Sequence, residues 1–377
     1  MTIIIGILAV VFLVMTFMVL SKTQSLLKGI RPTEAAADDS GEYVDDANNF
    51  NGYAMFGFWV LSVVGVVWSF LHYRKDFLPE AASVQGKETD YWFWVSMAVI
   101  TVGFFVVNTL LFYFAYKYRF KKGRVATFYP HNNKLEVIWT VIPAVIMAGL
   151  VFTGLKVWTD VMADAPADAE VIEIMGKQFG WQVRYPGVDD NKLGKYDYKL
   201  TNEAEGNEFG VDFADENSFD DFVNPSVMHI PAGRPVLLKI RARDVLHSVF
   251  IPHMRVKMDA VPGMPTKFWF TPTQTTDQAR AELGNPDFNF EIACTEVCGR
   301  GHFAMKLILV VDDEASYEKW KREQKPLLAM YPLLIEKVPT NLKAKAMKYL
   351  PVEEGVDPVV AEEAASTGGA GSQAALK

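Results

Sequence analysis

Four long apolar stretches without any charged residue constrain the fold of this chain more than any other feature of its sequence. They cover residues 3–20, 54–71, 91–116 and 137–155. About 20 apolar residues in an α-helix cross the hydrocarbon core of a bilayer, so the sequence predicts four membrane-spanning helices. The first stretch lacks the basic start and the small-residue cleavage site of a signal peptide. We therefore expect it to remain as a helix.

The segment between the third and fourth stretches is strongly basic. The positive-inside rule places such a loop in the cytoplasm. We therefore expect a multi-pass protein of the plasma (inner) membrane whose chain after residue 155 lies on the periplasmic side. Six basic residues precede the first acid of this segment, Glu136: Lys117, Arg119, Lys121, Lys122, Arg124 and Lys134.

From about Ala169 onward, continuous apolar runs give way to short segments of alternating polarity, which are typical of strands. Proline and glycine separate them, and we find no helix-length amphipathic pattern between them. This pattern predicts a small antiparallel β-sandwich or Greek-key barrel. The expected strand segments are residues 171–185, 234–243, 266–272, 288–294 and 305–311.

Two further segments differ from this pattern. Residues 187–224 contain eleven Asp and Glu against three Lys and few aliphatic residues. We predict a surface insertion there, whose acids could help to dock a basic partner. After Val311 the pattern becomes helical, with acids at its start as the helix dipole favours, and residues 366–377 are of low complexity. The net charge of −8 also disfavours nucleic acid as a partner.

The motif CTEVCGRGHFAM at residues 294–305 holds the only two cysteines of the sequence, Cys294 and Cys298. One interpretation is a disulfide. Covalent haem attachment needs C-x-x-C-H, which is not present. The third interpretation is a metal site, because thiolates, the imidazole of His302 and the thioether of Met305 together favour copper. His247, in the segment DVLHS, could supply a second imidazole.

The motif C-x-E-x-C-x-x-x-H-x-x-M downstream of DVLHS resembles subunit II of the haem–copper cytochrome c oxidases. Three other segments resemble that family, namely EVIWTVIPAVIMAGL (136–150), VKMDAVPGMP (256–265) and GKQFGWQVRY (176–185). The resemblance covers about residues 92–311. It implies membrane helices followed by an all-β, cupredoxin-like Greek-key barrel that carries a dinuclear copper centre, CuA.

The resemblance also implies the roles of the motif residues. Cys294 and Cys298 would bridge the two coppers, and His247 and His302 would each bind one of them. Met305 and the backbone carbonyl of Glu296 would be weak ligands. The Glu296 side chain would face the catalytic subunit, where a Mg²⁺ ion is expected.

Four further residues receive roles from the same resemblance. Glu136 would stand at the entrance of a proton pathway into the catalytic subunit, although an acid at a helix N-terminus is also favourable on its own. Asp244 would belong to the docking surface for a c-type cytochrome. The family motif G-x-Q-W-x-W reads GKQFGW here, so either Phe179 or Trp181 would receive the electrons, or the donor docks differently.

The expected domain organisation has five parts. Residues 1–53 and 54–90 are two extra transmembrane helices, each with a loop, and residues 91–160 are the helical hairpin typical of subunit II. Residues 161–312 are the periplasmic CuA domain with its insertion at 187–224, and residues 313–377 are a C-terminal extension that could bind a partner complex.

We therefore expect the subunit through which electrons enter a respiratory terminal oxidase. It would take them from a c-type cytochrome, or from a haem c domain of a partner complex, and pass them to haem in the catalytic subunit. That subunit reduces oxygen to water and pumps protons, and this chain alone holds no catalytic residues. Two alternatives remain, a membrane-anchored copper carrier or delivery protein without an oxidase partner, and a copper-free scaffold with a Cys294–Cys298 disulfide.

Overall fold

The computed structural model describes residues 12–13, 15–20, 22–23, 40–74, 76–121, 124–188 and 191–351. The first predicted span lies only partly within these residues, and its described positions are helical. The low-complexity segment 366–377 lies outside them.

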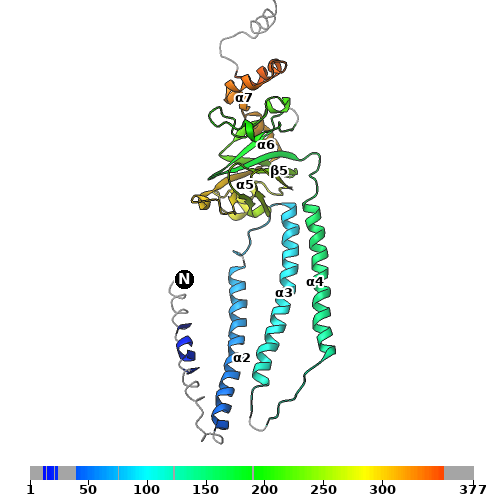
Figure 1. The fold of residues 1–377 in the computed structure, drawn as a ribbon, viewed down its shortest axis with the longest axis vertical. Coiled ribbons are helices and arrows are strands. Elements are labelled where there is room, and N and C mark those ends of the chain that lie inside the picture. The colour runs from blue at the N-terminus through cyan, green and yellow to red at the C-terminus, as the bar shows by residue number, and fades with distance from the viewer. Residues whose placement is uncertain are drawn as a thin grey trace, which may run out of the picture. The chain divides into compact units, whose positions relative to one another are not determined.

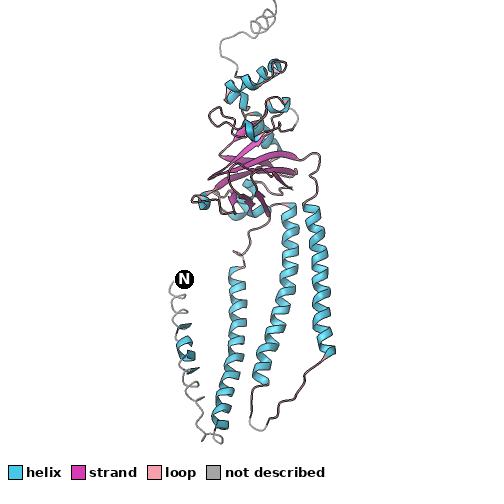
Figure 2. Cartoon of the chain, in the orientation of Figure 1, coloured by secondary structure: helices cyan, strands magenta, loops and turns pink. Residues whose placement is uncertain are grey.

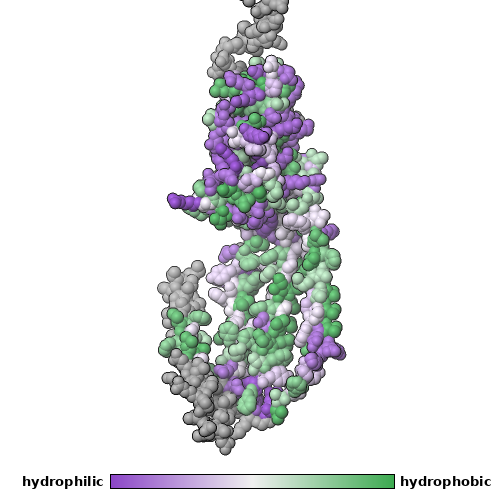
Figure 3. Space-filling view, in the orientation of Figure 1, coloured by the Kyte–Doolittle hydropathy of each residue, from purple (hydrophilic) through white to green (hydrophobic). Residues whose placement is uncertain are grey.

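Among the described residues, three helices are long and apolar enough to cross a membrane. They are α2 (Ser40–Tyr73), α3 (Val84–Lys117) and α4 (Asn133–Val161), and hydrophobic side chains cover much of their surface (Figure 3). They contain the second, third and fourth predicted spans. The sequence predicted a loop that continues to residue 53, but helix α2 begins at Ser40. The prediction is therefore wrong for residues 40–53, which are helical.

The chain divides into two compact units, and residues 1–74 with 99–134 form the first. Within this unit, α2 packs on α3 through Trp59, which is only 6% exposed. Its indole ring stacks on Phe112 with centroids 5.4 Å apart, and its N–H donates to Thr109 Oγ1 at 3.2 Å. At the other end of the contact, the Arg119 side chain donates to Asn49 Oδ1 at 2.8 Å. Aromatic packing and two polar contacts therefore hold α2 on α3.

The second unit, residues 75–98 with 135–377, contains two five-stranded sheets (Figures 1 and 2). One has the order β3-β2-β1-β5-β8, and the other has the order β4-β10-β9-β6-β7. The first comprises β1 (Glu170–Lys177), β2 (Gly180–Tyr185), β3 (Phe222–Asn224), β5 (Val236–Ala242) and β8 (Thr266–Phe270). The second comprises β4 (Val227–Pro231), β6 (His247–Ile251), β7 (Val256–Ala260), β9 (Phe290–Cys294) and β10 (Lys306–Asp312).

The two sheets share one core, because each strand buries alternate apolar side chains such as Ile172, Ile174, Leu238 and Ile240. All five predicted segments contain strands, but residues 171–185 form two antiparallel strands, β1 and β2, joined by a turn. The predicted all-β domain is confirmed. Most of its strand pairs are antiparallel as expected, but β1 pairs with β5 and β4 with β10 in parallel. The expectation of no helix between the strands is wrong. A capping box closes the N-terminus of α5 (Thr276–Leu283).

The acidic insertion is part of a second hydrophobic core, which corrects the prediction of a surface segment. Its core side chains are aromatic more often than aliphatic, and they meet α7 (Leu327–Met330) and the segment that follows it. Helix α6 (Glu314–Arg322), which Asp313 caps, precedes α7 and confirms the helical pattern predicted after Val311. The second core consists of Met175, Phe209, Val211, Phe213, Phe219, Leu327, Leu328, Leu334, Val338 and Ala346.

All four glutamates of the insertion form ion pairs within the domain. Glu203 contacts Lys177 and Arg243, and Glu208 contacts Lys177 at 2.5 Å. Glu205 pairs with Lys337 at 3.2 Å, and Glu216 pairs with Lys345 at 2.7 Å. These carboxylates therefore neutralise neighbouring cations of the same domain, which weakens the idea that they serve mainly to dock a basic partner.

Candidate metal centre

The two cysteines, two histidines and one methionine of the predicted site lie together in the β-domain. The Sγ atoms of Cys294 and Cys298 are 4.0 Å apart, and both cysteines are free thiols. His247 Nδ1 lies 3.9 Å from Cys294 Sγ, and His302 Nδ1 lies 3.7 Å from Cys298 Sγ. Met305 Sδ lies 3.8 Å from Cys298 Sγ. This structure does not contain the disulfide of the scaffold alternative.

The ends of two strands and one loop position the side chains of this cluster. His247 is the first residue of β6, and Cys294 is the last residue of the adjacent strand β9. The ligand loop, residues 295–305, leaves β9 and returns to β10. It closes where the Cys294 N–H donates to the Met305 carbonyl at 3.1 Å. The loop also turns the Glu296 carbonyl inward, 3.2 Å from Cys294 Sγ.

Phe179 packs directly against the ligand loop. A Cβ atom added at Gly301 would lie 2.5 Å from Cγ of the Phe179 ring, and one added at Gly299 would lie 3.0 Å from its Cε1. Gly299 also has a φ of +130°, which disfavours other residues. The two glycines of the motif therefore let an aromatic ring lie on the loop that carries Cys298 and His302.

Burial discourages charge on the Cys298 thiol in the absence of a cation. Burial and the neighbouring Cys294 together raise the pKa of Cys298 to about 11. A metal ion that binds thiolates must therefore displace protons, and its positive charge would offset the repulsion between the two sulfurs. Two thiols, two imidazoles and a thioether are soft ligands that suit copper better than zinc or magnesium. The residues present fit the copper centre that the motif implies.

Asp244 fixes the orientation of His247. Its Oδ1 atom accepts a hydrogen bond from His247 Nε2 at 2.8 Å. Partial burial would raise the pKa of Asp244, but the backbone N–H groups of Gln178 and Val245 and the His247 ring outweigh this effect and lower the pKa. Asp244 is thus an ionised acceptor within the centre, besides its predicted place on the docking surface.

The two candidate electron-receiving aromatics differ in exposure. Phe179 is 43% exposed on the ligand loop, whereas Trp181 is only 2% exposed. The Trp181 ring meets the His247 ring edge to face, with centroids 5.9 Å apart. Phe179 is therefore accessible from outside the domain, whereas Trp181 packs on His247 from inside.

Glu136 and the Glu296 side chain are not part of this cluster. Glu136 lies in the first turn of α4, about 38 Å of helix from the last residue of α4, Val161. The Glu296 side chain is half-buried beside Val297, which is 81% exposed.

Sequence reasoning missed Gln178. Its side-chain amide donates to the Cys298 carbonyl at 2.5 Å, and its backbone N–H donates to Asp244 Oδ2 at 2.7 Å. It therefore joins the β1–β2 turn to both the ligand loop and the loop before His247. The segment GKQFGW could have pointed to this residue, because Gln178 directly precedes Phe179 and lies three residues before Trp181.

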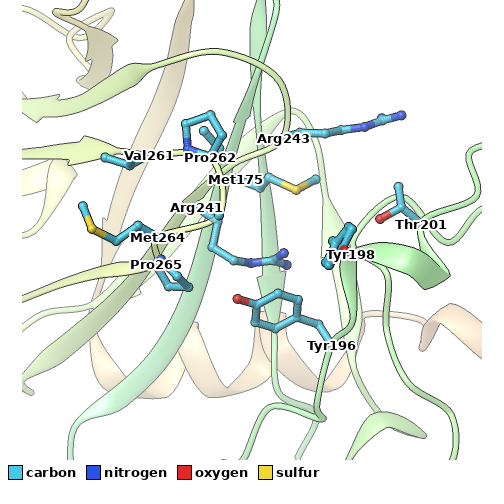
Figure 4. A pocket seen from close by; sticks show the side chains of 12 residues that line it. Met175, Tyr196, Tyr198, Thr201, Arg241, Arg243, Val261, Pro262, Met264 and Pro265 are labelled. Atoms are coloured by element: carbon cyan, nitrogen blue, oxygen red, sulfur yellow. The ribbon is translucent and has the colours of Figure 1, made fainter.

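A separate cavity of 470 Å³ lies beside the β-domain's first sheet, and no residue of the ligand cluster lines it. Figure 4 shows the Arg241 guanidinium facing the Tyr196 ring, at 3.6 Å from its centroid. Arg241 and Arg243 are already engaged by Glu173 and Glu203. The charges of this cavity are therefore compensated from within the domain.

The fold and the cluster together define a class, namely membrane-anchored proteins with a cupredoxin-like domain and a sulfur-rich metal centre. Two family models match the chain, the transmembrane domain of cytochrome c oxidase subunit II over residues 72–157 and its periplasmic domain over residues 170–312. The chain belongs to the cytochrome c oxidase subunit II family. Members of this family are subunits of the haem–copper oxidase complex.

Two relatives support this assignment by sequence. An alternative cytochrome c oxidase subunit 2 of Bradyrhizobium diazoefficiens is 36% identical over 234 residues, which are 62% of this chain and 77% of that relative. Cytochrome c oxidase subunit 2 of Cereibacter sphaeroides is 29% identical, over 65% of this chain and 78% of the relative. The crystal structure of the periplasmic domain of subunit II of a Bradyrhizobium japonicum cytochrome oxidase matches 41% of this chain and 93% of that chain, at 23% identity and a TM-score of 0.28.

Proposed function

We propose that this chain is the subunit through which electrons enter a respiratory terminal oxidase, and that its ligand cluster holds a dinuclear CuA centre. Cys294 and Cys298 would bridge two coppers, and His247 and His302 would bind one each. The observation that supports this most directly is the convergence of two thiols, two imidazoles and the thioether of Met305, at separations of 3.7 to 4.0 Å.

Copper bound through two shared thiolates would delocalise one electron over both metal ions and so transfer it with little change in geometry. The protein's part is to hold the ligands rigidly and to exclude water. His247 is fully buried, and Cys294 and Cys298 are 8% and 4% exposed. Strands β6 and β9 pair beside these ligands. A largely buried site on paired strands suits electron transfer.

A donor would approach the exposed Phe179, which lies on the ligand loop one residue from Gln178 and its contact to the Cys298 carbonyl. We assign the donor to the c-type cytochromes, or to a haem c domain of a partner complex, on the periplasmic side. The acceptor would be haem in the catalytic subunit.

Two carboxylates would serve the contact with the catalytic subunit. The half-buried Glu296 side chain, whose own carbonyl faces the sulfur cluster, would contribute an oxygen ligand to a Mg²⁺ ion there. Glu136, at the N-terminal end of α4 beside the basic segment 117–134, would receive protons on the cytoplasmic side. Both roles require the partner subunit.

The deciding experiment is electron paramagnetic resonance with copper analysis on the purified, oxidised complex. Two coppers per chain that share one unpaired electron would support CuA. A single localised Cu(II) would favour a mononuclear carrier without an oxidase partner. A chain that purifies without copper after supplementation and holds a Cys294–Cys298 disulfide would overturn the proposal.

A further inference from the structure

The start of helix α3 is built into the β-domain. The Ala82 N–H donates to the His253 carbonyl at 2.7 Å, and the Val84 N–H donates to the Thr271 carbonyl at 3.0 Å. The Ser83 hydroxyl donates to the Met254 carbonyl at 2.8 Å. Ala82 and Ser83 are 1% and 0% exposed. The segment that begins this membrane helix is therefore an integral part of the domain.

Arg255 holds this segment from the domain side. We call its contacts with Asp90 and Pro79 the clamp. Its guanidinium donates two parallel hydrogen bonds to the Asp90 carboxylate, from Nε and Nη2, each at 2.8 Å. Nη2 also donates to the Pro79 carbonyl at 2.5 Å. One side chain thus holds the chain both before and after the first residues of α3. The Arg255 side chain is only 11% exposed, so the pair is shielded from water and stronger than a surface pair.

The backbone of Arg255 is in the left-handed region, with φ of 56° and ψ of 28°. Glycine adopts this conformation without cost, whereas arginine does not. A position that favours glycine therefore carries a long side chain that makes four hydrogen bonds. This is the pattern expected where the side chain, and not only the turn, is required.

Strand β6 connects the clamp to the ligand cluster. It begins with His247, and the short helix Pro252–Met254 that ends at Arg255 follows it directly. Its five residues span about 17 Å. Strand β6 also pairs with β9, where Val249 lies opposite Cys294. The strand therefore begins at a proposed copper ligand, and Arg255 lies four residues after its last residue, Ile251.

At the second covalent junction of the domain, Val161 of α4 packs against the domain core, but no buried ion pair is found there among the described residues. Between α4 and β1, Asp164 forms an ion pair with Lys267 at 2.5 Å, but its side chain is 92% exposed and that of Lys267 is 55% exposed. Exposed pairs of this kind contribute little to rigidity. The α3 junction is thus the one at which a largely buried ion pair holds the domain on a membrane helix.

We propose that Arg255 is a positioning residue that fixes the copper ligands relative to helix α3 and thereby sets the rate at which electrons leave the centre toward the membrane. This inference rests on the proposed function. Electron transfer between two held centres falls steeply with distance and orientation, so a small tilt of the domain slows it. Transfer from the donor into the centre does not depend on the clamp, because the donor docks on the domain itself.

The test compares two rates in the intact oxidase. Asp90→Asn removes one charge of the clamp with almost no change of shape, and Asp164→Asn removes the exposed pair at the other junction as a matched control. Rapid kinetics would follow reduction of the copper centre by the donor and its reoxidation by the catalytic subunit. We expect Asp90→Asn to slow reoxidation about tenfold, with donor oxidation and the copper spectrum unchanged. Asp164→Asn should leave both rates as in the wild type.

Asp90→Glu, which keeps the charge, should recover most of the lost rate. If Asp90→Asn prevents assembly, Ser83→Ala takes its place, because it removes only the hydroxyl that binds the Met254 carbonyl. It should slow the same step by a smaller factor. Wild-type reoxidation in the assembled variants, or equal slowing of both steps, would overturn the clamp proposal. The absence of a copper signal in the wild-type complex would instead overturn the proposed function.

Discussion

The Asp244 carboxylate accepts a hydrogen bond from Nε2 of His247 at 2.8 Å, and Nδ1 of the same ring faces Cys294 Sγ at 3.9 Å. A carboxylate can only accept, so the ring proton is on Nε2 and Nδ1 keeps its lone pair. One hydrogen bond therefore selects both the tautomer and the orientation that metal binding needs.

Asp244→Asn should weaken metal retention without unfolding the domain. The amide can offer either its oxygen or its NH₂ group to His247, and it no longer raises the basicity of the ring. We expect the apparent copper affinity to fall about 10- to 100-fold, measured as copper retained against increasing chelator. Asp277→Asn, on the exposed side of α5, should behave as the wild type. If both variants retain copper equally well, Asp244 does not support metal binding.

Cys294→Ser and His302→Ala should each abolish oxidation of the donor while the complex still assembles. The serine hydroxyl is a much poorer bridging ligand than a thiolate, and the alanine leaves one copper without its imidazole. Stopped-flow oxidation of the reduced donor measures the loss, and gel filtration checks assembly. Wild-type turnover by either assembled variant would contradict the copper assignment.

Phe179 and Trp181 should have separable effects. Phe179→Ala removes the exposed ring on the ligand loop, so donor-to-copper transfer should slow while the copper spectrum stays the same. Trp181→Phe alters the ring that packs on His247, so the spectrum or potential should shift with a smaller change in the donor rate. The reverse outcome would make Trp181 the electron-receiving residue.

Asp221 should make stability depend on pH. Burial raises its pKa from 3.8 to about 7, against the attraction of Arg184, while Glu173 takes both Arg184 and Arg241 as partners. A raised carboxyl pKa means that the folded state binds the extra proton. The contribution of Asp221 to the free energy of unfolding is therefore largest below about pH 4 and is lost as the pH rises through about 7.

Asp221→Asn should flatten this pH dependence. Asp221 Oδ2 accepts from both Arg184 and the Gly194 N–H, whereas Oδ1 has no hydrogen-bond partner among the described residues. The asparagine oxygen can therefore replace Oδ2. Thermal denaturation of the full chain between pH 4 and 8 measures the effect. If the melting temperature of the variant depends on pH as steeply as that of the wild type, a group other than Asp221 causes the pH dependence.

The C-terminal extension should stabilise the domain through its second core. Leu328 is fully buried there, so Leu328→Ala should lower the free energy of unfolding by about 3 kcal/mol. Leu333→Ala, at a side chain that is 75% exposed, is the matched control. Chemical denaturation of the full chain measures both. Equal free energies of unfolding for the two variants would mean that the extension does not stabilise the domain.

Sequence patterns predicted the parts of this protein whose signals are local. Four strands of the first sheet, β1, β2, β5 and β8, are five to eight residues long and lie in segments of alternating polarity. The proposed copper ligands fall within one short motif and one segment upstream. Helix α5 was missed because it is only eight residues long, although Thr275 and Gln278 form a readable capping box. Strands β6 and β7 were missed because a short turn joins them.

Long-range packing could not be predicted in this way. Phe209 and Phe219 in the insertion and Leu334 in the extension are buried only because they meet one another, and no local pattern announces partners more than a hundred positions apart. The parallel pairing of β4 with β10 is non-local in the same sense. The Arg255–Asp90 clamp also depends on a contact between a membrane helix and a distant turn.

The second core also bears on biosynthesis. Its two main parts, residues 209–219 and 327–346, are separated in the chain by strands β3 to β10, and β10 must be made before β4 has its parallel neighbour. A ribosome that has made residues up to 300 has already produced His247, Cys294 and Cys298, but not the segments that close the domain. The chain therefore carries its thiols in an incomplete fold during synthesis, and a copper donor meets a finished site only after the last helices have been made.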